Sequence, residues 1–338
     1  NSIALCICSG GNFAAEEEIE EIVIVGDQLF QDTTDVSPTS IITSEDLTAI
    51  NMSTVEDALM YEPNLIIRRR FIGDPNGVIG MRGSNMYQAS RTMVFADGMP
   101  LHYHLQTRWS GSPRWSLVSP SEIEAAEVIY GPYSAEYGGN AMGGVVNLYT
   151  RNPTERKINI ETGYFSQSYD VLKTDESYTG NKFFASIEDR IGNTSYFLSF
   201  NRLDNEGQPQ FQHRSRPSRR SATVTGASGS IPGVDETGRD IIYFGDSGPE
   251  ESLTELVKLK VIHNIGELQF RGNIAYEQRE RDESNSNNYL KDSDGNVFYD
   301  RNFSLASDPS TVYDTTSWGT SVFQNRTQER DSLLVGFG

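Results

Sequence analysis

The sequence predicts a small mixed α+β domain followed by part of an antiparallel, membrane-spanning β-barrel. Residues 16 to about 152 mix short helix and strand signals, whereas apolar and polar residues alternate with period two from about Arg156 onward. The connections between the alternating segments are short and long in turn, which is typical of outer-membrane barrels. No apolar run approaches the roughly 18–20 residues that a membrane-spanning helix needs, which leaves strands as the means of crossing a membrane.

The composition supports a folded, strand-rich protein and restricts the classes of partner that it could bind. The chain has 338 residues, of which 36% are hydrophobic and 22% charged, and this is too apolar for disorder over most of its length. Its 30 Gly, 16 Tyr and 16 Phe suit strands joined by tight turns. The formal net charge of -19 repels phosphate, so nucleic acid is not an expected partner. Both cysteines, Cys6 and Cys8, lie near the start, which leaves the rest of the chain without a disulfide framework.

The sequence divides into four expected segments. Residues 1–15 combine a short apolar stretch with small residues and are interpreted as a signal-peptide remnant, with a disordered leader as the alternative. Residues 16–40 are acidic and then polar, and are expected to be flexible. Residues 41–153 form the α+β domain and residues 154–338 the barrel part. Because the last residues read as a strand that stops, the sequence is expected to be a fragment of a longer protein.

Helix and strand signals alternate through the α+β domain. Thr43 or Ser44 can cap a first helix, Thr54 and Asp57 have the spacing of a capping box, and Ser119 stands before a proline at a third helix start. The expected strands are Leu65 to Arg69, Val78 to Arg82, Thr92 to Ala96, Ala125 to Tyr130 and Gly144 to Thr150.

The second half alternates as a membrane barrel requires. Val257, Leu259 and Val261 form one apolar face, while Lys258 and Lys260 point the other way. A Lys or Arg on the lipid face costs about 2–4 kcal/mol near the midplane, so the charged face is expected to be the inner one. The six expected strands are 157–165, 182–190, 195–202, 255–263, 267–277 and 331 onward. The tight connections are 191–194 and 264–266, and the long polar ones are 166–181, 203–254 and 278–330. A secreted β-sandwich is the alternative, although such folds rarely sustain loops of this length.

Several motifs between Ile41 and Pro153 resemble the plug domain of TonB-dependent outer-membrane receptors. The most specific is Ala135 to Asn147, which reads AEYGGNAMGGVVN. The other matching segments are Thr54 to Leu59, Met81 to Gly83, Phe95 to Leu101 and Glu127 to Pro132. The resemblance implies a complete barrel of roughly 22 strands around a plugged lumen, of which this chain would hold about six.

An upstream β-branched segment resembles the TonB box of the same family. It consists of Glu21, Ile22, Val23, Ile24 and Val25. Such a segment can pair as an added strand with the edge of a partner's sheet, here TonB of the inner-membrane energy-coupling complex. An ordinary first strand of the plug is the alternative.

The resemblance places an aromatic and basic plug loop on the extracellular side. Its candidate substrate-binding residues are His102, Tyr103, His104, Arg108, Trp109 and Trp115, accompanied by Arg114. Aromatic and Arg side chains suit a planar, anionic chelate. The alternative is that these residues pack the plug against the barrel, and two histidines are too few for a closed metal site.

The resemblance also implies polar contacts between plug and barrel. Arg82, Arg69 and Glu136 are the expected contact residues, and Arg68, Arg69 and Arg70 could make such contacts or face the ligand. The glycines of the AEYGGNAMGGVVN motif are interpreted as packing residues. Asp292, Asp294 and Asn296 hint at calcium, but a solvated turn is the preferred interpretation.

No catalytic constellation, phosphate-binding loop or zinc motif appears, so the sequence indicates a transporter rather than an enzyme, with no cofactor. The resemblance implies TonB-dependent uptake of a scarce bulky solute, a ferric siderophore first, across the bacterial outer membrane. Vitamin B12, haem or an oligosaccharide would be alternative ligands, and a passive porin or adhesin an alternative class. The expected partners are TonB, outer-membrane lipid and a small-molecule chelate.

Overall fold

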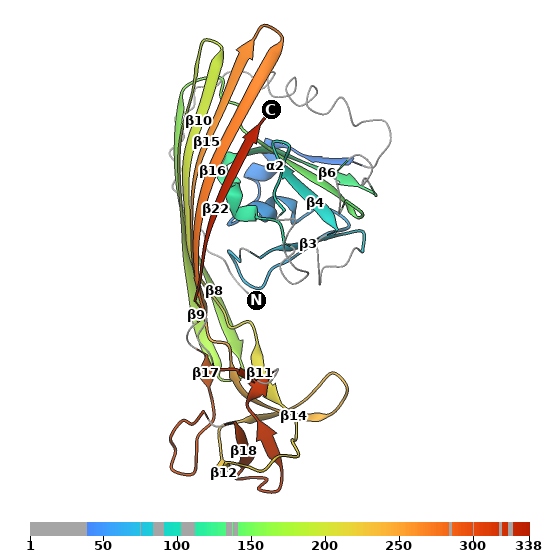
Figure 1. Cartoon of the computed structure of the whole chain (residues 1–338), viewed down its shortest axis with the longest axis vertical. Coiled ribbons are helices and arrows are strands. Elements are labelled where there is room, and N and C mark those ends of the chain that lie inside the picture. The colour runs from blue at the N-terminus through green and yellow to red at the C-terminus, as the bar shows by residue number, and fades with distance from the viewer. Residues whose placement is uncertain are drawn as a thin grey trace.

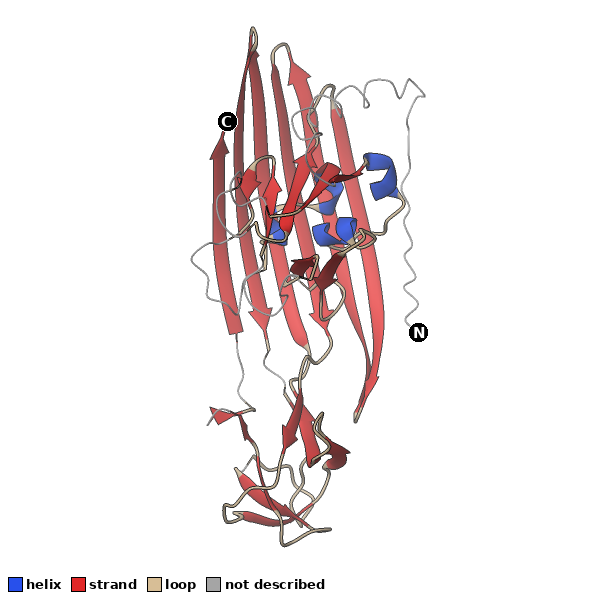
Figure 2. Ribbon diagram, turned by 90° about the vertical axis from the view of Figure 1, so that its right-hand side faces the viewer, coloured by secondary structure: helices blue, strands red, loops and turns tan. Residues whose placement is uncertain are grey.

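The computed structural model describes residues 39–74, 76–83, 91–102, 112–132, 137, 141–283, 286–299, 301–317, 320–323 and 327–338. Within these ranges the chain forms three bodies. A curved wall of long strands carries a mixed domain, the plug, on one of its faces (Figure 1). A small β-rich body, the loop module, lies at one end of the wall, where Figure 2 shows it below the long strands. The loop module comprises the described parts of 208–249 and 286–323.

The plug is built on a five-stranded sheet in the order β1-β6-β7-β4-β5. Its strands are β1 (Thr39–Ile42), β4 (Thr92–Ala96), β5 (Met99–Pro100), β6 (Ile123–Tyr130) and β7 (Gly144–Thr150). A separate antiparallel hairpin joins β2 (Leu65–Arg68) and β3 (Val78–Met81). Apolar side chains of the central strands, such as Val94, Val128 and Val146, are fully buried and form the plug core. All five strands expected from the sequence are present.

The helical elements of the plug are short. They are α2 (Ser44–Thr48), η1 (Val55–Leu59), η2 (Trp115–Leu117) and η3 (Pro120–Glu122), and the last three are 3-10 turns. The first predicted cap is confirmed, because Thr43 and Asp46 bond reciprocally at the start of α2. The other two predicted starts give single turns, since Ile123 begins β6 immediately after η3 and a proline follows η1 at position 63. None of the helices in the described part of the chain is long and apolar enough to cross a membrane.

The wall is a six-stranded antiparallel sheet in the order β22-β16-β15-β10-β9-β8. Its strands are β8 (Lys157–Val171), β9 (Thr174–Ile191), β10 (Thr194–Gly207), β15 (Glu250–Ile265), β16 (Leu268–Asp282) and β22 (Thr327–Phe337). All six expected strands occur, but they are longer than expected. The connection expected at 166–181 is wrong: β8 and β9 continue through it and turn at residues 172–173. In this extension the outward-facing residues are polar, such as Ser166, Ser168 and Asp170, so the apolar outer face that revealed the strand centres stops early.

The two faces of the wall differ as the sequence predicts. Val257 and Leu259 on β15 are 45% and 39% exposed, whereas Lys258 and Lys260 between them are only 2% and 1% exposed. The lysines point to the inner face, where the plug lies. The outer face therefore presents a continuous apolar surface suited to lipid.

The loop module has its own hydrophobic core. Phe244, Leu290 and Phe303 are buried there, with Phe298 and Tyr313 against them. Its strands are β11 (Gln212–Ser215), β12 (Val224–Ala227), β13 (Ile231–Val234), β14 (Asp240–Asp246), β17 (Asn287–Asn288), β18 (Asn302–Leu305), β19 (Val312–Asp314), β20 (Thr316–Ser317) and β21 (Thr320–Ser321). The two long connections pair with each other through β12 with β18 and β14 with β17. Two connections that the sequence shows only as long and polar thus form one folded unit.

Candidate functional site

The plug is attached to the wall by buried ion pairs that start on β15. Lys258 Nζ lies 3.1 Å from Glu122 Oε1 of η3, and Lys260 Nζ lies 3.1 Å from Asp97 Oδ2 in the turn between β4 and β5. Lys260 also donates to the carbonyl and hydroxyl oxygens of Thr150 at the end of β7. Burial alone would raise the pKa of the Asp97 carboxyl, but Lys260, Lys258 and the hydrogen bonds from Thr150 together hold that pKa below its ordinary value. Two inner-face lysines, two residues apart on β15, therefore bind three separate elements of the plug.

We call the contacts between the plug, side chains or backbone, and the inner face of the wall the plug–wall seam. Further polar contacts belong to it. Lys182 Nζ on β9 donates to the carbonyl of Met52 at 2.7 Å. Ser121 Oγ donates to Glu161 of β8, and Ser119 Oγ to Asn201 of β10 at 3.3 Å. Such contacts exchange readily for water, unlike the apolar contacts of a domain core. The seam is thus suited to a plug that is held firmly and can still separate.

A second charged cluster joins the plug to the end of the wall nearest the loop module. Arg70, just after β2, binds Asp74 at 2.7 Å and lies 3.4 Å from Glu250 at the start of β15. It also donates to Gln210, which lies where the loop module leaves the wall. Glu250 is shared with Arg281 of β16 at 2.5 Å. This end of the plug, its apex, is therefore connected at one place to both the wall and the base of the loop module.

The expected contact residues lie differently. Arg69 binds Asp57 of η1 inside the plug, and Arg70, its neighbour, makes the contact with the wall. Arg82 occupies an exposed turn with a positive φ of 50°, and its backbone N–H donates to Asn64. Glu136 lies outside the described residues. Among the described residues, the plug–wall ion pairs fall on Glu122 and Asp97, which were not expected, and on Arg70, which was one of the candidate arginines.

The expected substrate loop is partly described. Trp115 is 1% exposed and donates its Nε1–H to the carbonyl of Gly77 at 2.7 Å. It belongs to the plug core, which also takes in Leu256 and Ala275 from the wall. Its position matches the alternative of packing between plug and barrel. His102 is half-buried after β5, and its Nδ1 accepts from the backbone of Val94 at 3.4 Å. Tyr103, His104, Arg108 and Trp109 lie outside the described residues.

The segment that resembles a TonB box and the signal-peptide remnant also lie outside the described residues. Gly144, from the glycine-rich motif, is described and its role is packing. A Cβ there would stand 2.4 Å from the carbonyl oxygen of Ile129 and collide with the Met81 sulfur. Asp292 accepts hydrogen bonds from the backbone of Asp294 and Asn296 in a tight turn, consistent with the preferred solvated turn. In the described ranges no group of three or more His, Cys, Asp or Glu side chains is placed to hold a metal ion.

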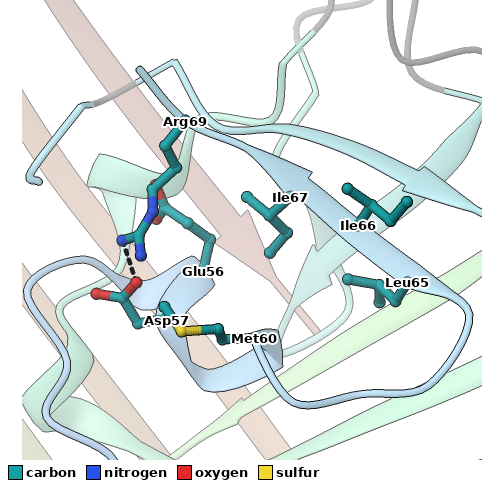
Figure 3. A pocket seen from close by; sticks show the side chains of 7 residues that line it. All are labelled: Glu56, Asp57, Met60, Leu65, Ile66, Ile67 and Arg69. Carbon is teal, nitrogen blue, oxygen red and sulfur yellow. Dashed lines mark hydrogen bonds and ion pairs between the residues drawn. The ribbon is translucent and has the colours of Figure 1, made fainter. Parts of the chain in front are cut away.

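A cavity of about 190 Å³ lies between η1 and β2 of the plug. Figure 3 shows its lining side chains, which are Glu56, Asp57, Met60, Leu65, Ile66, Ile67 and Arg69. Glu56 is 1% exposed, and neither carboxyl oxygen bonds to another group in the described part of the chain. Burial, together with the nearby Asp57 charge, raises the pKa of Glu56 to about 8. The carboxyl is therefore mostly protonated at neutral pH.

Sequence reasoning missed the inner-face lysines as plug contacts. The signal was present, because Lys258 and Lys260 interrupt an apolar alternation on the face that was already expected to be internal. A cation on a barrel's inner face needs either water or a carboxylate partner. The partners, Glu122 and Asp97, could not be identified because they are more than a hundred residues away in the chain.

Comparison with known proteins agrees with the plug and the wall. Residues 32–145 match the TonB-dependent Receptor Plug Domain family. The chain is 29% identical over 161 residues to the ferric enterobactin receptor PirA of Pseudomonas aeruginosa, covering 42% of this chain and 21% of PirA. A mutant of the ferric enterobactin receptor PfeA from the same organism superposes with a TM-score of 0.50 at 19% identity, over 74% of this chain and 34% of PfeA. The ferric yersiniabactin uptake receptor FyuA of Yersinia pestis gives a TM-score of 0.43 at 13% identity, over 73% of this chain and 41% of FyuA.

The chain spans about a fifth of the curated relative and about a third of the PfeA structure. The matched region coincides with the mixed domain that rests on the wall, and the PfeA superposition supports the same fold for the rest. The chain therefore contains a domain that matches the TonB-dependent receptor plug family, followed by antiparallel strands that share the fold of such a receptor's barrel wall.

Proposed function

We propose that the protein takes up a ferric siderophore across the bacterial outer membrane by TonB-dependent active transport. One observation carries the proposal: a plug domain is attached by buried, exchangeable polar contacts to the inner face of a wall whose outer face is apolar. A passive pore needs no such plug. The ferric enterobactin receptors among the relatives support an iron chelate as the substrate class.

The wall gives the direction of transport. In outer-membrane barrels short turns face the periplasm and long loops face outward. The two long connections that form the loop module thus face outward, together with the extended hairpin end at 172–173 that contacts them, and the turns at 192–193 and 266–267 lie on the periplasmic side. The plug apex, with Arg70, points toward the loop module and can receive a substrate from outside.

Transport then requires a signal through the plug. Substrate bound at the apex must favour one plug arrangement over another, since a ligand shifts an equilibrium only by its differential affinity for the two states. We assign the TonB contact to Glu21–Val25, which would pair with TonB as an added strand. Force applied there, driven by the proton gradient, would open the polar seam.

The test is uptake of radiolabelled iron as ferric enterobactin by cells that lack other receptors and express the full-length protein. Uptake that stops when TonB is deleted, while cell-surface binding persists, is the expected result. Uptake that continues at the same rate without TonB would point to a passive pore. Absence of any ferric enterobactin binding, alongside uptake of haem or vitamin B12, would replace the siderophore with another ligand.

A further inference from the structure

One buried carboxyl group of the plug borders a cavity without being bound by it. Glu56 of η1 is 1% exposed, and neither of its carboxyl oxygens bonds to a group in the described part of the chain. Gly77 lies against one side of it, because a Cβ on Gly77 would stand 2.9 Å from Glu56 Oε1. Gly77 is itself held by the Nε1–H of Trp115, which donates to its carbonyl. The carboxyl group thus lies between fixed backbone and the cavity of about 190 Å³.

The cavity has a charged side and an aliphatic side. Figure 3 shows Glu56, Asp57 and Arg69 at one side and the aliphatic residues of β2 at the other. Met60 and Ile66 line the cavity and are 47% and 57% exposed, so it can be entered from the surface of the plug. A cavity of about 150 Å³ in a protein core is large enough to hold benzene. This cavity therefore has room for a small organic molecule.

The charges around the cavity are unequal. Arg69 forms an ion pair with Asp57, which leaves Glu56 as a second carboxyl group beside one guanidinium. Burial and the Asp57 charge raise the pKa of Glu56 to about 8, although Arg69 acts in the other direction. The ionised form of Glu56 therefore lacks a counter-charge among the lining residues. A cation would supply it, whereas an anion would add to the negative charge.

We propose that this cavity binds a small organic cation, whose charged group pairs with Glu56 and whose apolar part lies against Leu65 and Ile67 of β2. An amidinium or guanidinium group suits Glu56 best, because its paired N–H donors match the two carboxyl oxygens. An ammonium group on a short apolar chain belongs to the same class. The inference does not rest on the proposed function, since the cavity lies within the plug and the argument uses no transport step.

Binding of the cation ionises Glu56. The O–H bond of the carboxyl group breaks, its proton passes to the buffer, and the carboxylate accepts from the N–H groups of the cation. The buried Thr54 hydroxyl beside it also favours the charged form. Because the pKa of Glu56 without the cation is about 8, binding at pH 7 should release about one proton. A cation bound at an exposed carboxylate would release none, since such a group is already ionised.

The test titrates benzamidinium chloride into the full-length receptor in detergent, at constant ionic strength set with sodium chloride. Calorimetry in two buffers of different ionisation enthalpy gives both the affinity and the number of protons released. We expect about one proton released at pH 7, and an affinity that rises by up to about tenfold per pH unit between pH 6 and 8. At pH 9 the neutral analogue benzamide should bind about tenfold or more weakly, because it forms no charge-assisted bonds.

Two variants assign the proton to its residue. Glu56→Gln keeps the shape of the side chain but cannot ionise, so it should release no proton and bind benzamidinium about tenfold or more weakly at pH 9. Glu45→Gln, an exposed change on α2, should behave like the wild type. The proton release of the wild type tests the inference by itself if Glu56→Gln does not fold.

Three results would overturn the cation site. Benzamidinium binding without proton release at pH 7 would place the cation at a surface carboxylate. Equal affinities for benzamidinium and benzamide at pH 9 would show that the cavity selects only apolar shape. Absence of binding would mean that the cavity of the full-length protein is already filled. None of these results depends on iron uptake, so the cation site and the proposed function stand or fall separately.

Discussion

The plug–wall seam and the loop module are held together in opposite ways. At the seam, charged pairs such as Lys258–Glu122 and Lys260–Asp97 are almost fully buried, with no side chain more than 5% exposed. The loop module instead packs aromatic rings, with Phe244 and Phe303 at its centre. The seam relies on buried ions and hydrogen bonds around a smaller apolar contact with Leu256 and Ala275 of the wall, whereas the interior of the loop module is apolar throughout its core.

The difference follows from what each region must do. Removing one partner of a buried ion pair is costly, but the intact pair adds little net stability compared with an apolar contact, because both ions give up hydration. A polar seam therefore fixes the position of the plug on the wall but contributes little net free energy to holding the two together. An apolar core resists both displacement and unfolding, which suits a module that must keep its shape outside the membrane.

The largest expected effect is a loss of iron uptake, and it tests whether force on the assigned TonB segment opens the plug–wall seam. Ile24→Pro removes a backbone donor from the assigned TonB segment, so uptake should fall to the background of a TonB-deficient strain. Surface binding of ferric enterobactin should stay within about twofold, because the apex is untouched. Thr33→Pro in the same 16–40 segment is the control. Normal iron uptake by the Ile24→Pro protein would remove the TonB assignment.

The next effect concerns the seam itself. Lys258→Met leaves Glu122 buried without its cation, and the plug should lose about 3–5 kcal/mol of stability. Denaturant unfolding followed by the emission of Trp115, with Trp109 and Trp318 replaced by Phe, measures it, because Trp115 is buried in the plug core. Lys157→Met, at an exposed pair, should change the stability by less than about 0.5 kcal/mol.

A double-mutant cycle shows whether the pair is the cause. Adding Glu122→Gln to Lys258→Met removes the stranded carboxylate, so the double variant should be clearly more stable than the sum of the single losses predicts. Additive losses would mean that packing, rather than charge, positions the plug on β15.

The loop module should respond to a different change. Phe303→Ala removes a fully buried ring from its core and should destabilise the module by about 3–5 kcal/mol. Limited proteolysis should then cut within 208–249 or 286–323 while the plug and wall remain intact. Cleavage spreading into the plug would show that the two regions fold as one unit, contrary to the contrast drawn above.

The sequence predicts the wall well where lipid imposes a pattern and poorly elsewhere. The alternation around Val257 located β15 and its inner face, because a residue on the wrong side would meet lipid. Beyond the membrane both faces are wet, so the extension of β8 to Val171 left no such signal. The loop module was missed for the same reason: its core residues are spread over two polar connections that pair only in three dimensions.

The sequence predicted what kind of contact holds the plug, but not which residues pair with each other at the plug–wall seam. Motifs located the plug, and an inner charged face was expected. Which carboxylate meets which lysine depends on how the plug is oriented on the wall, and no local pattern encodes that. Trp115 shows the limit in the other direction: a Trp in an apparently apical loop suggested substrate contact, whereas burial and a satisfied N–H place it in the core.

A last, pH-dependent effect sharpens the comparison from within the plug. Unlike the paired carboxylates of the seam, Glu56 is buried without a hydrogen-bond partner in the described residues, beside the Arg69–Asp57 pair. Because folding raises the pKa of Glu56 from 4.5 to about 8, its contribution is fully present below pH 4.5 and is lost as the pH rises toward 8. The free energy of plug unfolding should thus fall across this window by at most about 1.4 kcal/mol per pH unit, the slope for one proton. Glu56→Gln should flatten that slope in thermal unfolding measured at intervals from pH 5 to 8, whereas the exposed change Glu45→Gln should keep it. An equal slope in both variants would mean that Glu56 is ionised in the folded plug and that the cavity beside it admits enough water to hydrate the charge.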